Sequence, residues 1–451
     1  VGMFFTSQNG VCTGTLINAR TVIFAAHCVN YAPESAFGTQ IASSFSFNVD
    51  AFPGVLNWFQ NGFTTNTDLL TYNVSQIQYN PASLTRPEAR RFLEGDVALA
   101  TLDTPVVNVP TWALMFSPLP TPDAIDPVTG TGYHVNITGY GRTGSAFGGD
   151  FQGIDFRRRA AENMLGALGS LDDRGNALNT ALGNPSNFDT FPQNVYFIDF
   201  DSLNRDAIAD VNVFLDDALP GEGATAGGDS GGPLILDAAN NDGIEEDLVL
   251  GVLSGGGPAF DFGQPSNSYG DLSFYQPLYL FADYIAAANP YRYVSTLAGD
   301  GAWEDAAHWQ SDLDPNYRVI DASGAIVNGF PDQPSAGVTG TTPDFGQVCV
   351  DTDFFDIHAC QDLSTGVVSD PRAPAAGAGG VRRSRRRLHR QQTEYRGGAG
   401  SGAAEGCRSR WLVGLGFWRP VVPAARWFGL RDGTRYRSRS GCAQAVVRHS
   451  W

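Results

Sequence analysis

The stretch Gly228-Asp229-Ser230-Gly231-Gly232-Pro233 decides how the rest of the sequence is interpreted. Glycines on both sides of a serine let the backbone turn tightly, and such a turn can aim several N–H groups at one point while it presents the serine hydroxyl there. A serine hydroxyl alone is a poor nucleophile, so a base must lie within hydrogen-bond reach. We therefore expect Ser230 to be a nucleophile that is paired with a base elsewhere in the chain.

Two other segments carry the side chains that such a serine needs. His27 stands in Ala25-Ala26-His27-Cys28 after an apolar run, and it is the candidate base. Asp96 stands in Gly95-Asp96-Val97-Ala98-Leu99-Ala100 at the start of a predicted strand, and it is the candidate acid that orients the imidazole. Alone, a serine in a glycine turn is usually only a turn, and a lone histidine is usually a core residue. Their combination is what carries the argument.

The order His, Asp, Ser resembles the trypsin/chymotrypsin family of serine proteases and differs from that of subtilisins and α/β-hydrolases. Three further stretches are similar to strands of that family, namely Cys12-Thr13-Gly14-Thr15-Leu16-Ile17, Gly139-Tyr140-Gly141 and Gly251-Val252-Leu253-Ser254-Gly255-Gly256. The resemblance covers residues 1–290. It implies an all-β fold of two packed antiparallel six-stranded barrels, with the site between them and a short C-terminal helix.

The resemblance also implies the role of each residue. Ser230 would attack the scissile carbonyl, His27 would move the proton, and Asp96 would orient the imidazolium. The backbone N–H groups of Gly228 and Ser230 would form the oxyanion hole, and Cys12 and Cys28 would form a disulfide beside the site. The expected function is hydrolysis of peptide bonds through an acyl-enzyme, without a metal or an organic cofactor. The alternative is a protease-like surface or adhesion passenger that does not cleave.

Three residues are expected to bind substrate, namely Ala224, Ser254 and Gly256. Ala224 lies six residues before Ser230, where trypsin-like members carry an acid, so no carboxylate is available there to hold arginine or lysine. Gly255 stands where the family usually has a tryptophan. We expect a pocket that takes uncharged, apolar or small side chains.

The sequence departs from the family at its start. In the family's activated form, a new N-terminal ammonium lies beside the acid that precedes the nucleophile, which is Asp229 here. Only 11 residues precede Cys12. We therefore expect that the first strand and the activating terminus are missing and that this domain is N-terminally truncated. A buried Asp229 without a partner would cost about 3–5 kcal/mol, so we expect weak activity or low stability.

Short runs rich in Val, Ile, Phe and Tyr recur through residues 1–290, between turns of Gly, Pro, Asn and Asp. We predict strands over residues 21–26, 96–102, 135–139, 195–200, 233–236 and 248–254, and a closing helix over 281–288. Arg157-Arg158-Arg159 is expected to form a strand edge or a solvated face. Residues 237–247 are expected to be an acidic hairpin tip rather than a calcium loop.

Residues 291–371 are rich in Gly, Asp, Thr and Pro, and we expect a β-rich or irregular extension. Trp303 and Trp309 suggest one turn of an extended β structure with aromatic packing. This segment resembles the first passenger repeat of bacterial autotransporters. Cys349 and Cys360 are close enough for a local disulfide. We expect the acidic residues around His358 to form a solvated loop rather than a metal site.

Residues 372–451 hold 17 arginines and 3 acidic residues, whereas residues 1–371 hold 12 arginines and 44 acidic residues. Three interpretations of this tail stay open: a basic tail that binds lipid or nucleic acid, a disordered linker, or out-of-frame translation of a GC-rich gene. We favour the last, because such translation yields Arg, Gly, Ala and Pro and avoids lysine, of which the chain has none.

The net charge and the cysteines limit the binding partners and the cellular location that we expect. The net charge of −18 disfavours binding to nucleic acid, and no apolar run is long enough for a membrane span. Local cysteine pairs indicate an oxidising compartment, so we expect a secreted or bacterial cell-surface protein. No signal peptide is visible, and we expect the true N-terminus to be missing. The expected partners are protein or peptide substrates, and we expect a monomer.

Overall fold

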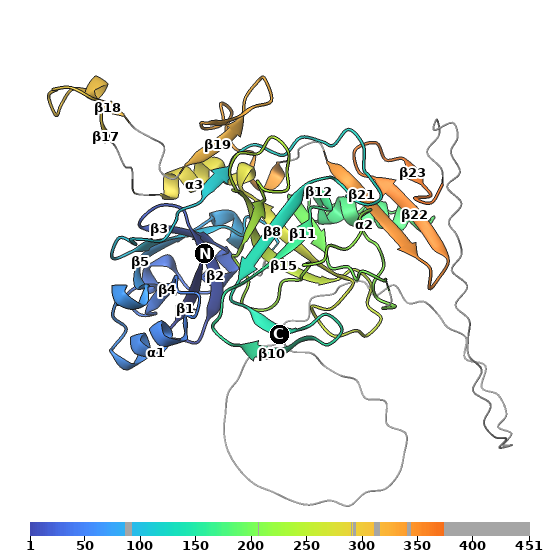
Figure 1. Ribbon diagram of the computed structural model, residues 1–451, viewed down its shortest axis with the longest axis horizontal. Coiled ribbons are helices and arrows are strands. Elements are labelled where there is room, and N and C mark those ends of the chain that lie inside the picture. The colour runs from blue at the N-terminus through green and yellow to red at the C-terminus, as the bar shows by residue number, and fades with distance from the viewer. Residues whose placement is uncertain are drawn as a thin grey trace, which may run out of the picture. The chain divides into compact units, whose positions relative to one another are not determined.

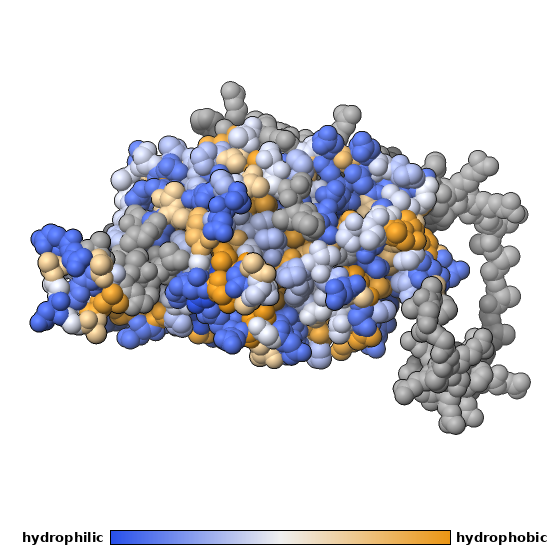
Figure 2. Space-filling model, turned by 90° about the horizontal axis from the view of Figure 1, so that it is seen from above, coloured by the Kyte–Doolittle hydropathy of each residue, from blue (hydrophilic) through white to orange (hydrophobic). Residues whose placement is uncertain are grey.

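A computed structural model describes residues 1–85, 93–205, 207–289, 291, 295–310, 316–340 and 344–373 (Figure 1). Almost all of its regular structure is β-sheet, as expected. Figure 2 shows polar residues over most of the face that is seen from above, with apolar residues in small groups between them. No helix among the described residues is long and apolar enough to cross a bilayer.

The N-terminal part forms a closed barrel in the order β1-β2-β3-β6-β5-β4. Its core holds Phe4, Phe24 and Phe45, whose ring centroids lie 5.1–5.6 Å apart. The expectation that the first strand is missing is wrong, because residues 2–6 pair with two neighbours and close the barrel. The strands are β1 (Gly2–Thr6), β2 (Val11–Leu16), β3 (Thr21–Phe24), β4 (Ser43–Ser46), β5 (Thr71–Tyr79) and β6 (Ala98–Leu102).

The second barrel is built on the path β11-β8-β14-β15-β16-β13-β12. β11 and β12 are separated by only two residues, so the sheet begins and ends on the same stretch of chain. The Leu165 N–H donates to Tyr133 on one side, and the Gly166 N–H donates to Phe197 on the other, both at 2.9 Å. The strands are β8 (His134–Gly139), β11 (Arg159–Met164), β12 (Ala167–Ser170), β13 (Asn194–Asp199), β14 (Pro233–Leu236), β15 (Leu248–Pro258) and β16 (Asp271–Pro277).

The predicted elements are present with shifted ends. The predicted strand over residues 21–26 ends at Phe24, and Ala26–Cys28 form a 3-10 turn instead. The closing helix is α3 (Ala282–Ala288). The expected strand edge after Arg157 is β11, the first strand on the path of the second barrel. Two helices were not predicted, namely α1 (Phe52–Gln60) and α2 (Leu171–Ala181).

The β-rich extension is not a separate part of the molecule. β19 (Tyr317–Ile320) pairs with β7 (Ala113–Met115), and β21 (Phe345–Thr352) pairs with β12. Tyr317 and Phe345 are buried in the core of the second barrel. The described residues on both sides of the boundary expected at residue 290 therefore belong to one compact unit. In Figure 1, β21 and β22 (Ile357–Asp362) lie beside α2.

Two local expectations for residues 291–371 are confirmed. β17 (Ser295–Thr296) pairs with β18 (Trp309–Gln310), and the Trp303 and Trp309 ring centroids lie 4.5 Å apart. A disulfide joins Cys349 of β21 to Cys360 of β22. Of the arginine-rich tail, only Arg372 and Ala373 are among the described residues, so the interpretations of residues 374–451 lie outside them.

Candidate active site

His27 sits in the turn that follows β3, and Asp96 fixes it at two points. The His27 backbone N–H donates to Asp96 Oδ1 at 2.7 Å, and the ring Nδ1 lies 2.7 Å from Asp96 Oδ2. Cys28 forms the expected disulfide with Cys12 of β2, which fastens the same turn to the barrel. The imidazole remains partly exposed, with 17% of its side-chain surface accessible. The predicted base and acid are thus in contact.

Asp96 lies just before β6, and its side chain is fully buried. A buried carboxylate is destabilised unless hydrogen-bond donors surround it. Oδ1 accepts from the His27 N–H, and Oδ2 accepts from the Ser254 hydroxyl at 2.6 Å as well as contacting the imidazole. Ser254 was expected to bind substrate, and its contact with Asp96 was not predicted.

A pair of buried amides supports the backbone around Asp96. The Asp96 N–H points to Gln276 Oε1 at 3.4 Å, and Gln193 Nε2 donates to the same oxygen at 2.5 Å. Gln193 Oε1 in turn accepts from the Gly95 N–H at 2.7 Å. Neither glutamine stands in a motif, so nothing in the sequence marked them. They connect β6 to the strands of the second barrel.

The loop that carries Ser230 is held against the first barrel. The Thr13 N–H of β2 donates to the Ser230 carbonyl at 2.8 Å, and this carbonyl also lies 4.0 Å from Cys28 Sγ. Gly231 has φ +84°, and a Cβ there would lie 2.3 Å from the Thr13 carbonyl oxygen, so only glycine fits. The Cys12 and Cys28 sulfurs lie within 4.8 Å of a His27 ring nitrogen. The Cys12–Cys28 disulfide therefore lies beside both the Ser230 backbone and His27.

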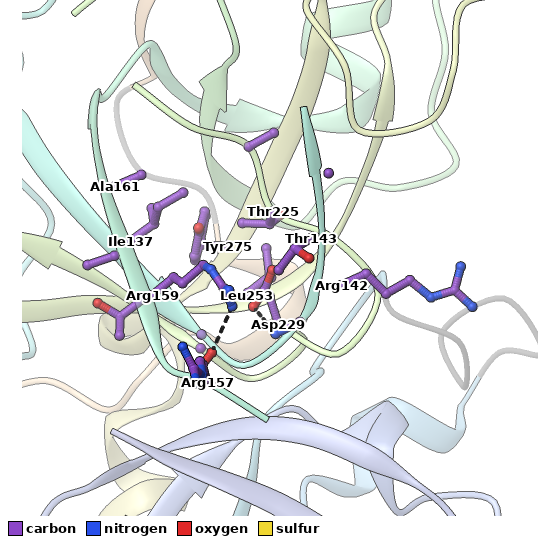
Figure 3. A pocket seen from close by; sticks show the side chains of 17 residues that line it. Ile137, Arg142, Thr143, Arg157, Arg159, Ala161, Thr225, Asp229, Leu253 and Tyr275 are labelled. Atoms are coloured by element: carbon purple, nitrogen blue, oxygen red, sulfur yellow. Dashed lines mark hydrogen bonds between the residues drawn. The ribbon is translucent and has the colours of Figure 1, made fainter. Parts of the chain in front are cut away.

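The Asp229 side chain lines a cavity of about 250 Å³ (Figure 3). Its Oδ1 accepts from the Gly141 N–H at 2.6 Å, and its Oδ2 accepts from the Ala226 N–H at 2.9 Å. Among the described residues, the ammonium that the family's activated form supplies is not a contact of Asp229, and two backbone N–H donors bind its carboxylate. Gly141 has to be glycine here, because a Cβ would lie 2.4 Å from Asp229 Oδ2.

The electrostatics around Asp229 favour its neutral form despite these bonds. Burial raises the pKa of the Asp229 carboxyl to about 6, while the two N–H donors and the more distant Arg159 guanidinium oppose the shift. Arg157 and Arg159 also line the cavity, and Figure 3 shows Arg142 extending away from the other side chains. The cavity thus contains one carboxyl group with a raised pKa, and arginine side chains line it.

The three residues expected to bind substrate are placed differently. Ala224 lines the cavity, whereas Ser254 and Gly256 are not among its lining residues. Gly256 pairs with Ser273 across β15 and β16. Beside Ala224, the Thr225 and Ser273 hydroxyls lie 2.8 Å apart and satisfy each other.

Residues 1–155 match the family model for Trypsin. The matched range includes His27, Asp96 and the Cys12–Cys28 disulfide, whereas Ser230 lies beyond it. No curated protein matches the chain.

Proposed function

We propose that this chain, whose residues 1–155 belong to the trypsin family of serine proteases, is an active endopeptidase. Its catalytic triad consists of Ser230, His27 and Asp96. The single observation that carries this proposal is the paired contact of Asp96 with His27, at 2.7 Å to both the backbone N–H and the ring Nδ1. A carboxylate in this position keeps the proton on Nδ1 and leaves Nε2 as the base.

Each proposed step follows from this tautomer. His27 Nε2 takes the proton from the Ser230 hydroxyl as its oxygen bonds to the scissile carbonyl carbon. The N–H groups of Gly228 and Ser230 stabilise the negative charge on the carbonyl oxygen. His27 then gives its proton to the leaving amine, and the acyl group stays on Ser230. Water, activated by the same imidazole, hydrolyses this ester and restores the enzyme.

The loop backbone supports the oxyanion role. Gly228 has φ +105°, which a residue with a side chain rarely adopts, and its carbonyl is held by the Thr13 hydroxyl at 2.9 Å. The Thr13 N–H holds the Ser230 carbonyl as well. Thr13 of the first barrel thus fixes the carbonyls of Gly228 and Ser230, on both sides of Asp229. These two bonds set the orientation of the peptide groups between Gly228 and Ser230.

The proposed substrates are proteins or peptides with an uncharged side chain at P1. Ala224 offers a methyl group, the neighbouring hydroxyls of Thr225 and Ser273 bind each other, and the Asp229 carboxylate in the same cavity is already bound by two backbone N–H donors. Arg157 and Arg159 face this cavity and would repel a cation. We further propose secretion or a place on the bacterial cell surface, because two disulfides persist in oxidising compartments. The autotransporter context rests on the Trp303 segment alone.

Hydrolysis of a protein substrate and of peptide amides tests the proposal. We expect the wild-type chain to cleave casein and the Ser230→Ala variant to lose about 10⁴-fold or more in kcat. Ser145→Ala is the matched control, because it removes an exposed hydroxyl outside the triad, and it should keep full activity. If Ser230→Ala and wild type cleave at the same rate, the proposed nucleophile is wrong. If folded wild type cleaves nothing, the domain is a non-catalytic relative.

A further inference from the structure

Three buried carboxylates meet in the loop that connects β13 to the Ser230 turn. Asp199, Asp201 and Asp216 are each 3% exposed, and one carboxylate oxygen of each lies within 4.8 Å of the others. Asp199 ends β13, whereas the other two belong to irregular backbone. None of the three has a role in the proposed mechanism, so their common burial needs its own explanation.

Several oxygens in this group have no hydrogen-bond partner. Asp201 Oδ1 and Asp216 Oδ1 are fully buried and accept no hydrogen bond. Asn212 Oδ1 is also buried and accepts no hydrogen bond. The Asn212 side-chain amide lies against the group, because it donates to the Asp216 carbonyl at 3.1 Å. A buried oxygen without a donor destabilises the fold. Three orphaned oxygens at one place indicate a ligand that supplies positive charge.

The cationic side chains that the structure describes near this group are too few to balance its charge. Arg205 contacts Asp201 and Asp210, the latter at 3.3 Å, and donates to the Asp216 carbonyl at 2.9 Å. The charge of Arg174 also acts on Asp199, but its Nε and Nη2 have no hydrogen-bond partner. With Asp210 and Glu222, the group holds five carboxylates against two guanidinium groups.

Burial also disfavours the charged form of these carboxyl groups. Burial, the largest cause, raises the pKa of Asp199 to about 6 and that of Glu222 to about 8, and their acidic neighbours add to both shifts. For Asp201 and Asp216, burial and the charge of Asp199 raise the pKa well above the usual range. Several negative charges therefore cannot exist together here without a further cation.

We propose that Asp199, Asp201 and Asp216 bind a calcium ion, with the Asn212 side-chain oxygen beside them. Calcium takes six to eight oxygen ligands at about 2.3–2.6 Å, so two of its ligands lie at most about 5 Å apart, which agrees with the observed 4.8 Å limit. Magnesium requires a near-ideal octahedron at about 2.0–2.1 Å and retains several waters. Two irregular loop segments with buried carboxylates suit the larger and more adaptable ion.

The site would stabilise the loop that leads to the substrate cavity. Glu222 Oε1 accepts from the Asp201 N–H at 2.6 Å, and Glu222 stands two residues before Ala224. Asn163 bridges the Asp199 and Gly223 carbonyls at 2.7 and 3.4 Å. A cation that joins Asp201 to Asp216 would therefore fix both ends of the loop. This inference does not depend on the proposed triad.

Calorimetric titration of the full chain with CaCl₂, after removal of metal with EDTA, tests the site. We expect saturable binding with a dissociation constant on the order of 10⁻⁴–10⁻³ M or tighter, and a Tm that rises with calcium. Asp216→Asn should weaken binding at least about 10-fold, because it removes a charged ligand. Asp68→Asn is the matched control, since it removes an exposed carboxylate of the N-terminal barrel, and should bind like wild type.

Wild type that shows no saturable binding up to about 10 mM calcium would overturn the proposal, as would unchanged binding by Asp216→Asn. If Asp216→Asn does not fold, Asp201→Asn decides instead. It should also weaken binding at least about 10-fold, because it removes another charged ligand. Unchanged binding by folded Asp201→Asn would show that calcium binds at ordinary surface carboxylates and would exclude this site.

Discussion

The Ser254 hydroxyl donates to Asp96 Oδ2 at 2.6 Å, and this is the oxygen that His27 Nδ1 contacts at 2.7 Å. Asp96 Oδ2 therefore contacts both Ser254 of the second barrel and the proposed base His27, which follows β3 of the first barrel. Since both Ser254 and Asp96 are buried, water cannot replace the hydroxyl easily. Ser254 acts as a positioning residue for Asp96 in the proposed mechanism.

Ser254→Ala should lower kcat about 10- to 100-fold, because a hydrogen bond to a charged group contributes about 1.5–3 kcal/mol. Steady-state kinetics with a peptide amide measures this, and KM should change little. Ser254→Thr keeps the hydroxyl and should recover most of the loss. A rise in KM at constant kcat would instead show that Ser254 acts only by touching substrate.

Asp96→Asn should lower kcat about 10⁴-fold, because an amide donor facing Nδ1 favours the wrong imidazole tautomer. The comparison uses kcat on a peptide amide for folded protein, verified by circular dichroism. Asp103→Asn is the control, since this carboxylate is exposed just beyond β6 and accepts hydrogen bonds from the Thr65 hydroxyl. Near-normal turnover by Asp96→Asn would refute the role given to Asp96.

Asp229 should make the stability of the protein depend on pH. Its pKa of about 6 in the folded state lies above the ordinary 3.8, so folding favours the protonated form. This contribution is complete below pH 4 and disappears as the pH rises through 6, with an amplitude of about 1–3 kcal/mol. Urea denaturation from pH 4 to 8 should show a smaller decline for Asp229→Asn than for wild type. Parallel curves would contradict this.

Removal of the Cys12–Cys28 disulfide should reduce both stability and activity. Its cysteines are 16 residues apart, which corresponds to about 3 kcal/mol. Cys12→Ser/Cys28→Ser should also lower kcat, because Cys28 adjoins His27. Cys349→Ser/Cys360→Ser removes the other disulfide, which lies in β21 and β22, and should lower Tm without lowering kcat. Equal kcat losses in both double variants would disprove a local effect on His27.

Ala224→Asp should shift the substrate preference toward arginine and lysine at P1. The new carboxylate would stand beside Thr225 and could bind a cationic side chain, so the ratio of kcat/KM for arginine over alanine should rise at least about 10-fold. A peptide library read by mass spectrometry measures the profile. Ala224→Asn, which has the same shape without the charge, should leave the ratio unchanged. A wild-type preference for arginine would contradict the proposed pocket.

The contact between His27 and Asp96 was predictable because each residue stands in a local motif with a recognisable neighbour. The other partners of the Asp96 segment were not predictable, since Ser254, Gln193 and Gln276 lie more than 90 residues away from it in the sequence. Side chains that meet only after both barrels have folded leave no periodic pattern. The same reason explains why the partners of Asp229 were missed, because backbone N–H donors have no sequence signature.

The fold shows a similar division. Short apolar runs between turns predicted the strands, but the family's first strand was expected to be missing because only 11 residues precede Cys12, and Gly2–Thr6 supplies it. The extension was wrongly separated from the barrels because Tyr317 and Phe345 are isolated apolar residues in a polar segment, and their burial depends on tertiary pairing. The buried acids at 199, 201 and 216 resemble surface loop residues in sequence, and only their burial distinguishes them.

Labelling with a fluorophosphonate probe tests the central claim most directly, since the probe reacts only with a serine that a base has activated. The account predicts one modified residue, Ser230, identified by mass spectrometry of the digested chain. The rate constant should fall at least about 10³-fold in His27→Ala, while Ser145→Ala labels like wild type. Labelling at another serine, or an unchanged rate in folded His27→Ala, would contradict the account.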